Sequence, residues 1–515
     1  MFAKTYSAQL RGLSPELVCV ETDISKGLHS FNMIGLPDKA TEEARGRINA
    51  AIKNSGFKPP IRGNRKVTIA LAPANLQKSG SHFDVALTLS YLKANKDLTF
   101  DEKNKLFLGE LSLDGSVKKI TGVLLLTKMA KELGFEEIYV PEENTREAGL
   151  IKNIKIFGLK NLKSLINHLD TKPKKDTTSD QRIFLTPARA TKINTTNQNF
   201  EVDFSDVKGQ EEVKRALIIA ASGGHNIAMT GTPGVGKSML AKAFNGILPP
   251  LSFDEIIETS GIHSAAGIIE RNLITHRPFR SPHHTSSYVS LIGGGNDPKP
   301  GEVSLAHKGV LFLDEFPEFD RRVIESLRQP LEEKSIIIAR SKGVYKFPAN
   351  FILVAAMNPC PCGYKNSKHK NCTCSPVEQN RYHKKISGPI IDRIDIWIEV
   401  PEIKHEILLV KNKTQETSSM VKEKVVLARN IQSDRFKNHP IKTNAEMSPK
   451  ELLQFAILTK DLQDILNQAA RRLGLSARAY HRVIKLARTI ADLDNKQNIE
   501  AGHILEALQY RAKNN

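Results

Sequence analysis

The chain has little cysteine and no long apolar run, and it lacks internal repeats and long low-complexity tracts. Only five cysteines occur in 515 residues, and four of them fall between Cys360 and Cys374, which is not the pattern of a disulfide-stapled secreted protein. No apolar run approaches the ~20 residues of a membrane helix, and residues 1–6 lack the apolar core of a signal peptide. These absences predict a soluble, cytoplasmic protein without a membrane segment.

Positive charge is in excess along the whole chain. The formal net charge is +19, and the excess is spread out instead of collected in one tail. Such a field favours polyanionic partners, chiefly nucleic acid, although acidic membrane surfaces and solubility alone are alternatives. A length of 515 residues is typical of about three domains.

A glycine-rich run fits the pattern G-x-x-x-x-G-K-[ST], whose backbone N–H groups surround the phosphates of a nucleoside triphosphate. The apolar segment 225–230 before it predicts a strand, and 239–247 predicts a helix. In this context the helix N-terminus and the lysine favour the phosphates, and the final hydroxyl is a ligand for Mg²⁺. The sequence therefore predicts a site for ATP and Mg²⁺, and not a plain glycine-rich turn, formed by Gly231, Thr232, Pro233, Gly234, Val235, Gly236, Lys237 and Ser238.

Two carboxylates follow the apolar run 308–313. A strand buried on both faces places its carboxyl end beside the phosphate loop, at the ligand-binding edge of a parallel sheet. Asp314 can then hold the hydrated Mg²⁺ together with Ser238, and Glu315 can orient or deprotonate the attacking water.

The next apolar run, 350–357, ends in the amide of Asn358. At the tip of a neighbouring strand this amide can hydrogen-bond the lytic water or the γ-phosphate. The alternative is a simple strand-ending turn before Pro359.

Predicted elements divide the chain into regions. Strands and helices mix before residue 168, and strands alternate with helices from 204 to 401, which implies a parallel sheet with crossover helices. The segment 448–512 is helical by pattern, and 171–198 has the composition of an exposed basic linker. We expect domains at 1–168, 201–402 and 403–515, with the linker at 169–200.

Several runs together resemble a known family. Asp203-Phe-Ser-Asp-Val-Lys-Gly209-Gln210 is similar to the adenine-side box of AAA+ ATPases, and its order relative to the phosphate loop, Asp314-Glu315 and Asn358 is that of an AAA+ module. The chain as a whole resembles the magnesium-chelatase-like YifB/ComM family. The runs that carry this resemblance are Phe279-Arg-Ser-Pro-His-His284-Thr, Pro300-Gly-Glu-Val-Ser-Leu-Ala-His307, Asn358-Pro-Cys-Pro-Cys-Gly363 and Gly388-Pro-Ile-Ile-Asp-Arg393-Ile-Asp.

The resemblance implies an AAA+ core, a C-terminal helical lid and a hexameric ring with nucleotide sites between subunits. It implies that Gly209 and Gln210 lie on the adenine side, that Arg393 is an arginine finger for a neighbour's γ-phosphate, and that Arg478 is a second sensor reporting nucleotide state to the lid. A guanidinium neutralises transition-state charge whatever the family. A surface Arg–Asp pair and a solvated basic face are the alternatives for these two arginines.

Residues 335–347 have the pattern of a β-hairpin with a basic tip. Related AAA+ rings place such a hairpin in the central pore, so the resemblance implies that Arg340, Lys342 and Lys346 contact DNA phosphates in a sequence-independent manner. An ordinary solvated hairpin is the alternative.

Two further features lie before the Asp-Glu strand. Gly293–Gly295 is a candidate for a second mobile pore loop. His283 and His284 are adjacent and therefore point in different directions, so we expect a structural role for them.

The cysteine cluster consists of two C-x-C pairs separated by nine residues. Four thiolates so close together in a cytoplasmic chain favour tetrahedral Zn²⁺, and the lysines between the pairs favour thiolates. Redox chemistry and plain reduced thiols are the alternatives. The candidate zinc ligands are Cys360, Cys362, Cys372 and Cys374.

The N-terminal region resembles the substrate-cleaving domain of Lon-type proteases. Residues 77–84 are similar to the stretch with the serine nucleophile, and the runs 107–115 and 120–124 to the stretch before the catalytic lysine. His82 and Leu124 stand at those two positions, so the resemblance implies a Lon-protease-like α+β domain that has lost proteolysis. We expect this domain to serve ring assembly or substrate gating.

Taken with the resemblance, the sequence predicts an ATP-dependent hexameric DNA motor. The family implies a helicase that promotes branch migration in recombination of incoming DNA during natural transformation, with DNA and other recombination proteins as partners. The alternative is a magnesium-chelatase-type ATPase subunit that drives metal insertion or remodels a protein partner, although no D-x-S-x-S ion motif occurs in the chain. A non-enzymatic or proteolytic assembly protein is the third possibility.

Overall fold

The structure is a computed structural model. It describes residues 1–61, 64–78, 80–172, 184–191, 200–268, 273–295, 298–340, 343–365, 367, 369–403, 406 and 416–511.

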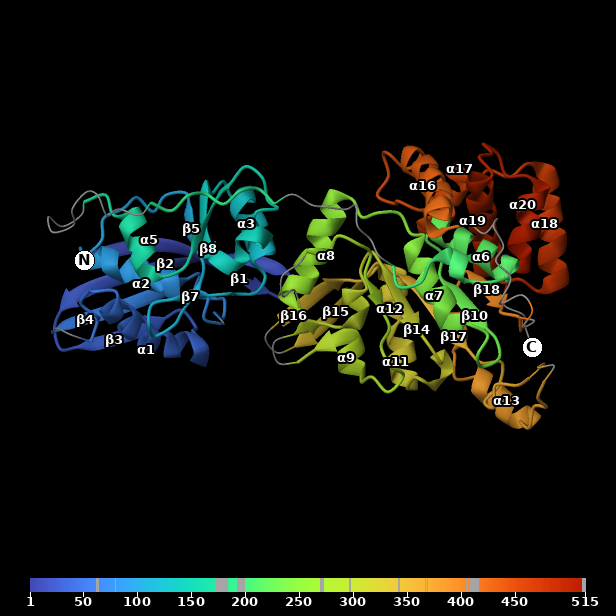
Figure 1. The fold of residues 1–515 in the computed structure, drawn as a ribbon, viewed down its shortest axis with the longest axis horizontal. Coiled ribbons are helices and arrows are strands. Elements are labelled where there is room, and N and C mark those ends of the chain that lie inside the picture. The colour runs from blue at the N-terminus through green and yellow to red at the C-terminus, as the bar shows by residue number, and fades with distance from the viewer. Residues whose placement is uncertain are drawn as a thin grey trace. The chain divides into compact units, whose positions relative to one another are not determined.

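The chain divides into two compact units (Figure 1). The first unit combines Met1–Asn194 with Ile257–Leu273, and the second combines Thr195–Ile256 with Ile274–Asn515. Among the helices in the described ranges, none is long and apolar enough to cross a membrane.

The first unit is built on a four-stranded sheet in the order β1-β2-β4-β3, in which only β3 runs parallel to its neighbour. A parallel sheet β5-β8-β9 and a short antiparallel pair β6-β7 complete it. Helix α2 packs on β1 and β2 and is buried over almost its whole length, which explains why its apolar residues are not confined to one face. The elements are β1 (Phe2–Arg11), β2 (Ser14–Lys26), β3 (Ser30–Ile34), α1 (Lys39–Asn54), β4 (Arg65–Ala72), α2 (Asp84–Ala94), β5 (Lys105–Phe107), β6 (Glu110–Leu111), β7 (Val117–Lys118), α3 (Val123–Glu132), β8 (Glu137–Pro141), α4 (Thr145–Ala148), β9 (Lys155–Leu159) and α5 (Leu162–Leu169).

Part of the predicted linker belongs to this unit. Residues 184–191 are held by the N–H of Ala188, which donates to the carbonyl of Ile156 (2.7 Å), and by the N–H of Leu185, which donates to Nδ1 of His168 (3.1 Å). The other linker residues from 173 to 199 lie outside the described residues.

The end of helix α8 (Phe253–Ala265) also belongs to the first unit. The hydroxyl of Ser264 donates to the buried carboxylate of Glu147 and accepts a hydrogen bond from the N–H of Gly122 (2.9 Å). Glu147 also accepts from the N–H of Leu124 (3.0 Å). This segment comes from the middle of the predicted ATPase core, which the sequence pattern did not indicate.

The second unit is built on a five-stranded sheet in the order β11-β14-β17-β10-β18, and every neighbouring pair is parallel. The predicted parallel sheet with crossover helices is therefore confirmed. The antiparallel hairpin β15-β16 follows β14 and precedes β17, as predicted. The strands are β10 (Ile227–Thr230), β11 (Phe279–Arg280), β12 (Gly293–Gly294), β13 (Lys299–Pro300), β14 (Val310–Leu313), β15 (Ser335–Arg340), β16 (Gly343–Pro348), β17 (Ile352–Met357) and β18 (Ile396–Glu399).

Helices surround this sheet and continue into the C-terminal region. Helices α16 and α19 pack on α6, and the apolar side chains of the C-terminal helices share one core with the sheet. The prediction that segment 448–512 is helical is confirmed for its described residues. The helices are α6 (Glu211–Gly223), α7 (Lys237–Gly246), α9 (Tyr288–Ile292), α10 (Glu302–Leu305), α11 (Arg321–Ser326), α12 (Arg328–Glu333), α13 (Pro376–His383), α14 (Gly388–Ile391), α16 (Ser418–Arg435), α17 (Pro449–Phe455), α18 (Lys460–Leu473), α19 (Ala477–Leu493) and α20 (Ala501–Gln509).

The strand order brings three chain segments to one edge. Figure 1 shows β14, β17 and β10 side by side, and Leu313 pairs with Ala355 while Thr230 pairs with Met357. Because the strands are parallel, the residues that follow them emerge at the same edge.

Candidate nucleotide-binding site

The phosphate loop connects β10 to α7. Gly234 and Gly236 have φ angles of 84° and 90°, in the left-handed region that favours glycine, and they turn the chain into the helix. The side-chain amide of Gln210 donates to the carbonyl of Val235 (3.0 Å), so the segment predicted to lie on the adenine side supports the loop directly.

Lys237 is buried at the first turn of α7. Its ammonium donates to the carbonyls of Gly231 (2.6 Å) and Thr232 (3.1 Å) and to Oδ1 of Asn358 (3.0 Å). Burial lowers the pKa of Lys237, and the charges of Asp314 and Glu315 act in the opposite direction. All three acceptors are neutral oxygens. The negatively charged phosphate oxygens of a nucleotide can replace them, because they form stronger hydrogen bonds with the ammonium.

Ser238 and Asp314 form the second contact of the site. The hydroxyl of Ser238 donates to Oδ2 of Asp314 over 2.9 Å, and Ser238 is exposed. Neighbouring ligands of an octahedral Mg²⁺ at 2.0–2.1 Å lie about 2.9 Å apart. The pair therefore fits Mg²⁺ in both ligand chemistry and spacing.

Glu315 stands at the open side of the site with φ 53°, an unusual backbone conformation for a residue other than glycine. Its carboxylate lies 3.2 Å from Nδ1 of His284, and the ring of His284 is tilted against that of His283 with centroids 4.2 Å apart. The sequence argument placed this histidine pair in a structural role and missed the contact. The signal that would have found it is its position just after β11, the strand beside β14.

Arg393 and Arg478 lie elsewhere in the unit. Both line a cavity of about 750 Å³, and no described residue in its lining belongs to the phosphate loop. Arg393 donates one hydrogen bond to the carbonyl of Pro389 (2.7 Å). It also pairs with the carboxylate of Glu332, and the hydrogen bond between these two side chains lowers the pKa of Glu332. Arg482 of α19 donates to the carbonyl of Ile391 (3.1 Å), so a helix of the C-terminal region supports the turn that carries Arg393.

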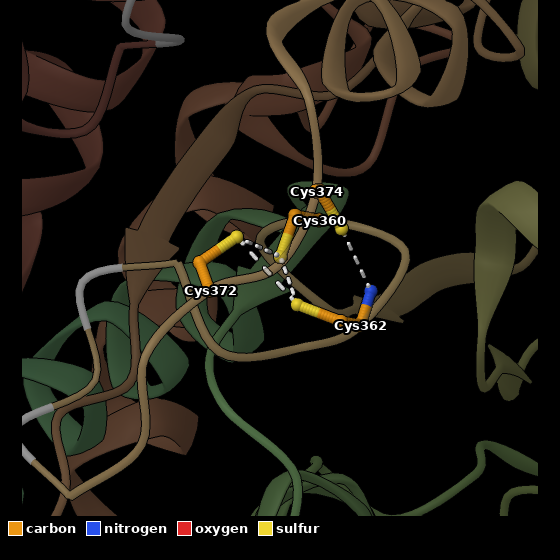
Figure 2. A group of neighbouring side chains, drawn as sticks. All are labelled: Cys360, Cys362, Cys372 and Cys374. Atoms are coloured by element: carbon orange, nitrogen blue, oxygen red, sulfur yellow. Dashed lines mark hydrogen bonds between the residues drawn. The ribbon is translucent and has the colours of Figure 1, made fainter.

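The four cysteines meet in the loop between β17 and α13, residues 359–375, which we call the cysteine loop. Their sulfur atoms all lie within 4.8 Å of one another, and Figure 2 shows Cys360, Cys362 and Cys372 facing a common centre. The Sγ atoms of these three are 3.4–3.6 Å apart, close to the ~3.8 Å of a tetrahedral zinc site with Zn–S of about 2.3 Å. The backbone N–H groups of Tyr364 and Thr373 lower the pKa of the Cys362 thiol to about 6.

The hairpin β15-β16 carries the predicted DNA contacts. Arg340 and Lys346 are exposed, and Lys342 lies outside the described residues. Lys346 pairs in register with Ile337 on the exposed face, where Ile337 and Val344 are 47% and 68% exposed. Lys346 therefore shares one face of the hairpin with these two apolar side chains, and Arg340 stands at the tip on the alternate face.

Comparison with known proteins identifies the family. Three family models match: "Magnesium chelatase, subunit ChlI" over residues 203–408, "Subunit ChlI of Mg-chelatase" over 20–144, and "Magnesium chelatase, subunit ChlI C-terminal" over 415–511. Competence protein ComM of Haemophilus influenzae is 39% identical over 99% of this chain and 97% of its own length. The chain belongs to the YifB/ComM family of magnesium-chelatase-like proteins.

Other members and a distant relative extend this result. YifB of Escherichia coli is 39% identical over 97% of this chain and 95% of its own length. DNA replication licensing factor Mcm6 of Drosophila melanogaster is 22% identical over 59% of this chain and 36% of its own length. The family and the phosphate-loop geometry together identify an ATPase of the AAA+ type that uses ATP and Mg²⁺.

Proposed function

We propose that this protein is an ATP-driven DNA motor that works as a hexameric ring and promotes branch migration when incoming DNA recombines during natural transformation. The observation that carries the proposal is a complete phosphate site in the same unit as an exposed basic hairpin. Two relatives, a competence protein and a DNA replication licensing factor, support it.

In the proposed reaction each group at the sheet edge has one task. Lys237 binds the β- and γ-phosphates. Ser238 and Asp314 would hold Mg²⁺, which would supply positive charge near the transferring phosphoryl group. Glu315 leaves His284 and orients or deprotonates the attacking water. Asn358 releases Lys237 and binds the γ-phosphate or that water.

Arg393 and Arg478 act on the nucleotide of a neighbouring subunit. The cavity that they line contains no described residue of this chain's own phosphate loop, so a ring contact is the arrangement that gives both guanidiniums a phosphate. On binding, the neighbour's γ-phosphate displaces Glu332 from Arg393. We place Arg478 in the same role, in addition to reporting nucleotide state to the lid.

DNA binds along the hairpin β15-β16 and the segment Gly293–Gly295. The two lie together, because a Cβ placed on Gly294 would be 3.3 Å from Nη2 of Arg340. Arg340, Lys342 and Lys346 contact phosphates, and the exposed Ile337 and Val344 contact bases or sugars. Movement of this region with the nucleotide state pulls the DNA.

Zinc is the metal we propose for the cysteine loop. Four cysteine sulfurs within 4.8 Å of one another match the ligand set of a closed structural site, and zinc bound there would crosslink the loop. Cys360, Cys362, Cys372 and Cys374 would hold it.

The first unit is proposed to have a Lon-protease-like fold without proteolysis. Leu124 is fully buried, and Nε2 of His82 is buried with no hydrogen-bond partner among the described residues. Burial lowers the pKa of His82 to about 4, so this histidine is neutral near pH 7. Neither position offers a nucleophile or a base to a substrate.

ATP hydrolysis by the purified full chain, with and without single-stranded, duplex and four-way-junction DNA, tests the proposal. We expect DNA to stimulate hydrolysis and Lys237→Ala to lower it by at least about a hundredfold. Lys242→Ala on the same helix is the matched control. Hydrolysis that is indifferent to every DNA would reject the motor and favour the chelatase-type or protein-remodelling alternative.

A further inference from the structure

The cysteine loop touches the phosphate loop in two places. A Cβ placed on Gly363 would lie 2.7 Å from Cγ of Pro233, so the two loops are in direct contact there. At the second place a carboxylate lies between them: Oε1 of Glu402 accepts hydrogen bonds from the hydroxyls of Thr232 (3.1 Å) and Ser367 (2.9 Å). Nε2 of His369 lies 3.7 Å from the other oxygen of Glu402.

We propose that Glu402 is a positioning residue of the phosphate loop and that metal binding in the cysteine loop sets nucleotide affinity through it. The positioning role is argued from the contacts of Glu402 alone. The coupling to metal binding rests on the proposed zinc site.

The backbone fixes Glu402 beside the phosphate loop. The N–H of Val400, just after β18, donates to the carbonyl of Thr230 (2.7 Å). The amide of Gln210 bridges the carbonyls of Pro401 (3.4 Å) and Val235 (3.0 Å). The strand end that carries Glu402 is therefore hydrogen-bonded to both ends of the phosphate loop. This holds the carboxylate within hydrogen-bond distance of Thr232.

Thr232 passes this support on to the lysine. Its side chain is buried, and its carbonyl accepts a hydrogen bond from the ammonium of Lys237 (3.1 Å). Because Glu402 holds the hydroxyl of the same residue, it fixes the position of that carbonyl. Loss of Glu402 leaves Thr232 free to turn, so the phosphate loop and the lysine are no longer held in the geometry that receives the nucleotide.

A metal ion in the cysteine loop would hold Ser367 and Gly363 in place. Both lie between the two C-x-C pairs, so a crosslink of the four thiolates closes the loop on either side of them. Without the metal the loop gains conformational freedom, and its contacts with Glu402 and Pro233 weaken.

The first test compares two substitutions of Glu402 in equilibrium binding of a fluorescent ATP analogue to the full chain. Glu402→Gln and Glu402→Ala both remove the negative charge, but only Gln keeps an acceptor oxygen for Thr232. We expect Ala to bind the analogue about three- to tenfold more weakly than Gln. Glu132→Ala, an exposed site on α3, is the control. Equal affinity of the Ala and Gln variants would overturn the positioning role.

The second test measures zinc by elemental analysis, together with ATP affinity, in wild type, Cys372→Ser/Cys374→Ser and the control Cys19→Ser. We expect about one zinc per wild-type chain and its loss in the double variant. The double variant should also bind ATP three- to tenfold more weakly. Combining it with Glu402→Ala should cause no further loss of affinity, because both changes act through the same contact. Chelator-stripped wild type should regain affinity when zinc is restored, which guards against misfolding of the variant.

The outcomes separate the two claims. A wild type without zinc overturns the zinc proposal and the coupling, while the Glu402 comparison still decides the positioning role. Zinc that is bound and removed with unchanged ATP affinity overturns the coupling alone.

Discussion

Buried polar side chains are used differently in the two units. In the second unit Lys237 binds neutral oxygens beside the exposed Ser238, so an entering nucleotide can take over its contacts. In the first unit Lys78 is fully buried, and its ammonium donates to the backbone carbonyls of Pro73 and Leu76. Asp84 is 1% exposed and is held by Arg47 over 2.7 Å. The same residue types serve a ligand site where exposed groups such as Ser238 lie beside them, and stability where they are enclosed.

Glu315→Gln gives the largest expected effect on the second unit. It removes the proposed base while keeping the shape of the side chain, so kcat should fall by about a thousandfold with ATP affinity little changed. Single-turnover hydrolysis and equilibrium nucleotide binding measure the two quantities. Glu333→Gln, on the exposed end of α12, is the control. A comparable loss of binding would contradict the assignment.

Asp84→Ala should damage the first unit without touching the site of the second. The substitution leaves Arg47 without its carboxylate partner and the N–H of Leu111 without its acceptor, since this N–H donates to Asp84 over 3.1 Å. The free energy of unfolding should therefore fall by about 3 kcal/mol. Thermal and denaturant unfolding measure this loss. ATP affinity of the folded fraction should stay at the wild-type value, and a change in affinity would break the contrast between the units.

The first unit should also lose stability in mild acid through His82. Its pKa is about 4 in the folded chain against 6.5 for an unperturbed histidine, so the unfolded chain binds more protons between these values. Stability is therefore full above about pH 6.5 and is lost as pH falls toward 4, by about 2 kcal/mol at pH 5. Unfolding of wild type and His82→Gln at pH 7.5 and pH 5 measures this. An equal acid response in both would refute the role of His82.

His284→Ala should give the smallest effect. The pair with Glu315 is partly exposed, with side chains 31% and 52% accessible, so it is worth no more than about 1 kcal/mol. Freeing Glu315 should raise basal hydrolysis two- to fivefold. A fall in the rate would mean that His284 orients Glu315 for the reaction instead of holding it back.

Local patterns predicted much of this protein, and long-range contacts did not follow from them. The strands that end before Asp314 and Asn358 are short apolar runs, and the rule that parallel strands meet at one edge brought their tips to the phosphate loop. Thr232 and Glu402 are 170 residues apart in the sequence, and no local sequence motif indicates that they are in contact. Likewise, Ser264 joins the first unit because its hydroxyl meets Glu147, which only tertiary packing decides. Cys360 to Cys374 were predicted to cluster because their spacing is short.

Conversion of a labelled four-way junction into duplex products tests the central claim most directly. We expect the full chain to convert the junction only with ATP and Mg²⁺, and Arg340→Ala/Lys346→Ala to lose conversion while keeping basal ATP hydrolysis. Glu315→Gln should bind the junction without converting it. An active ATPase that never converts the junction, or conversion that the hairpin substitutions leave unchanged, would contradict the account.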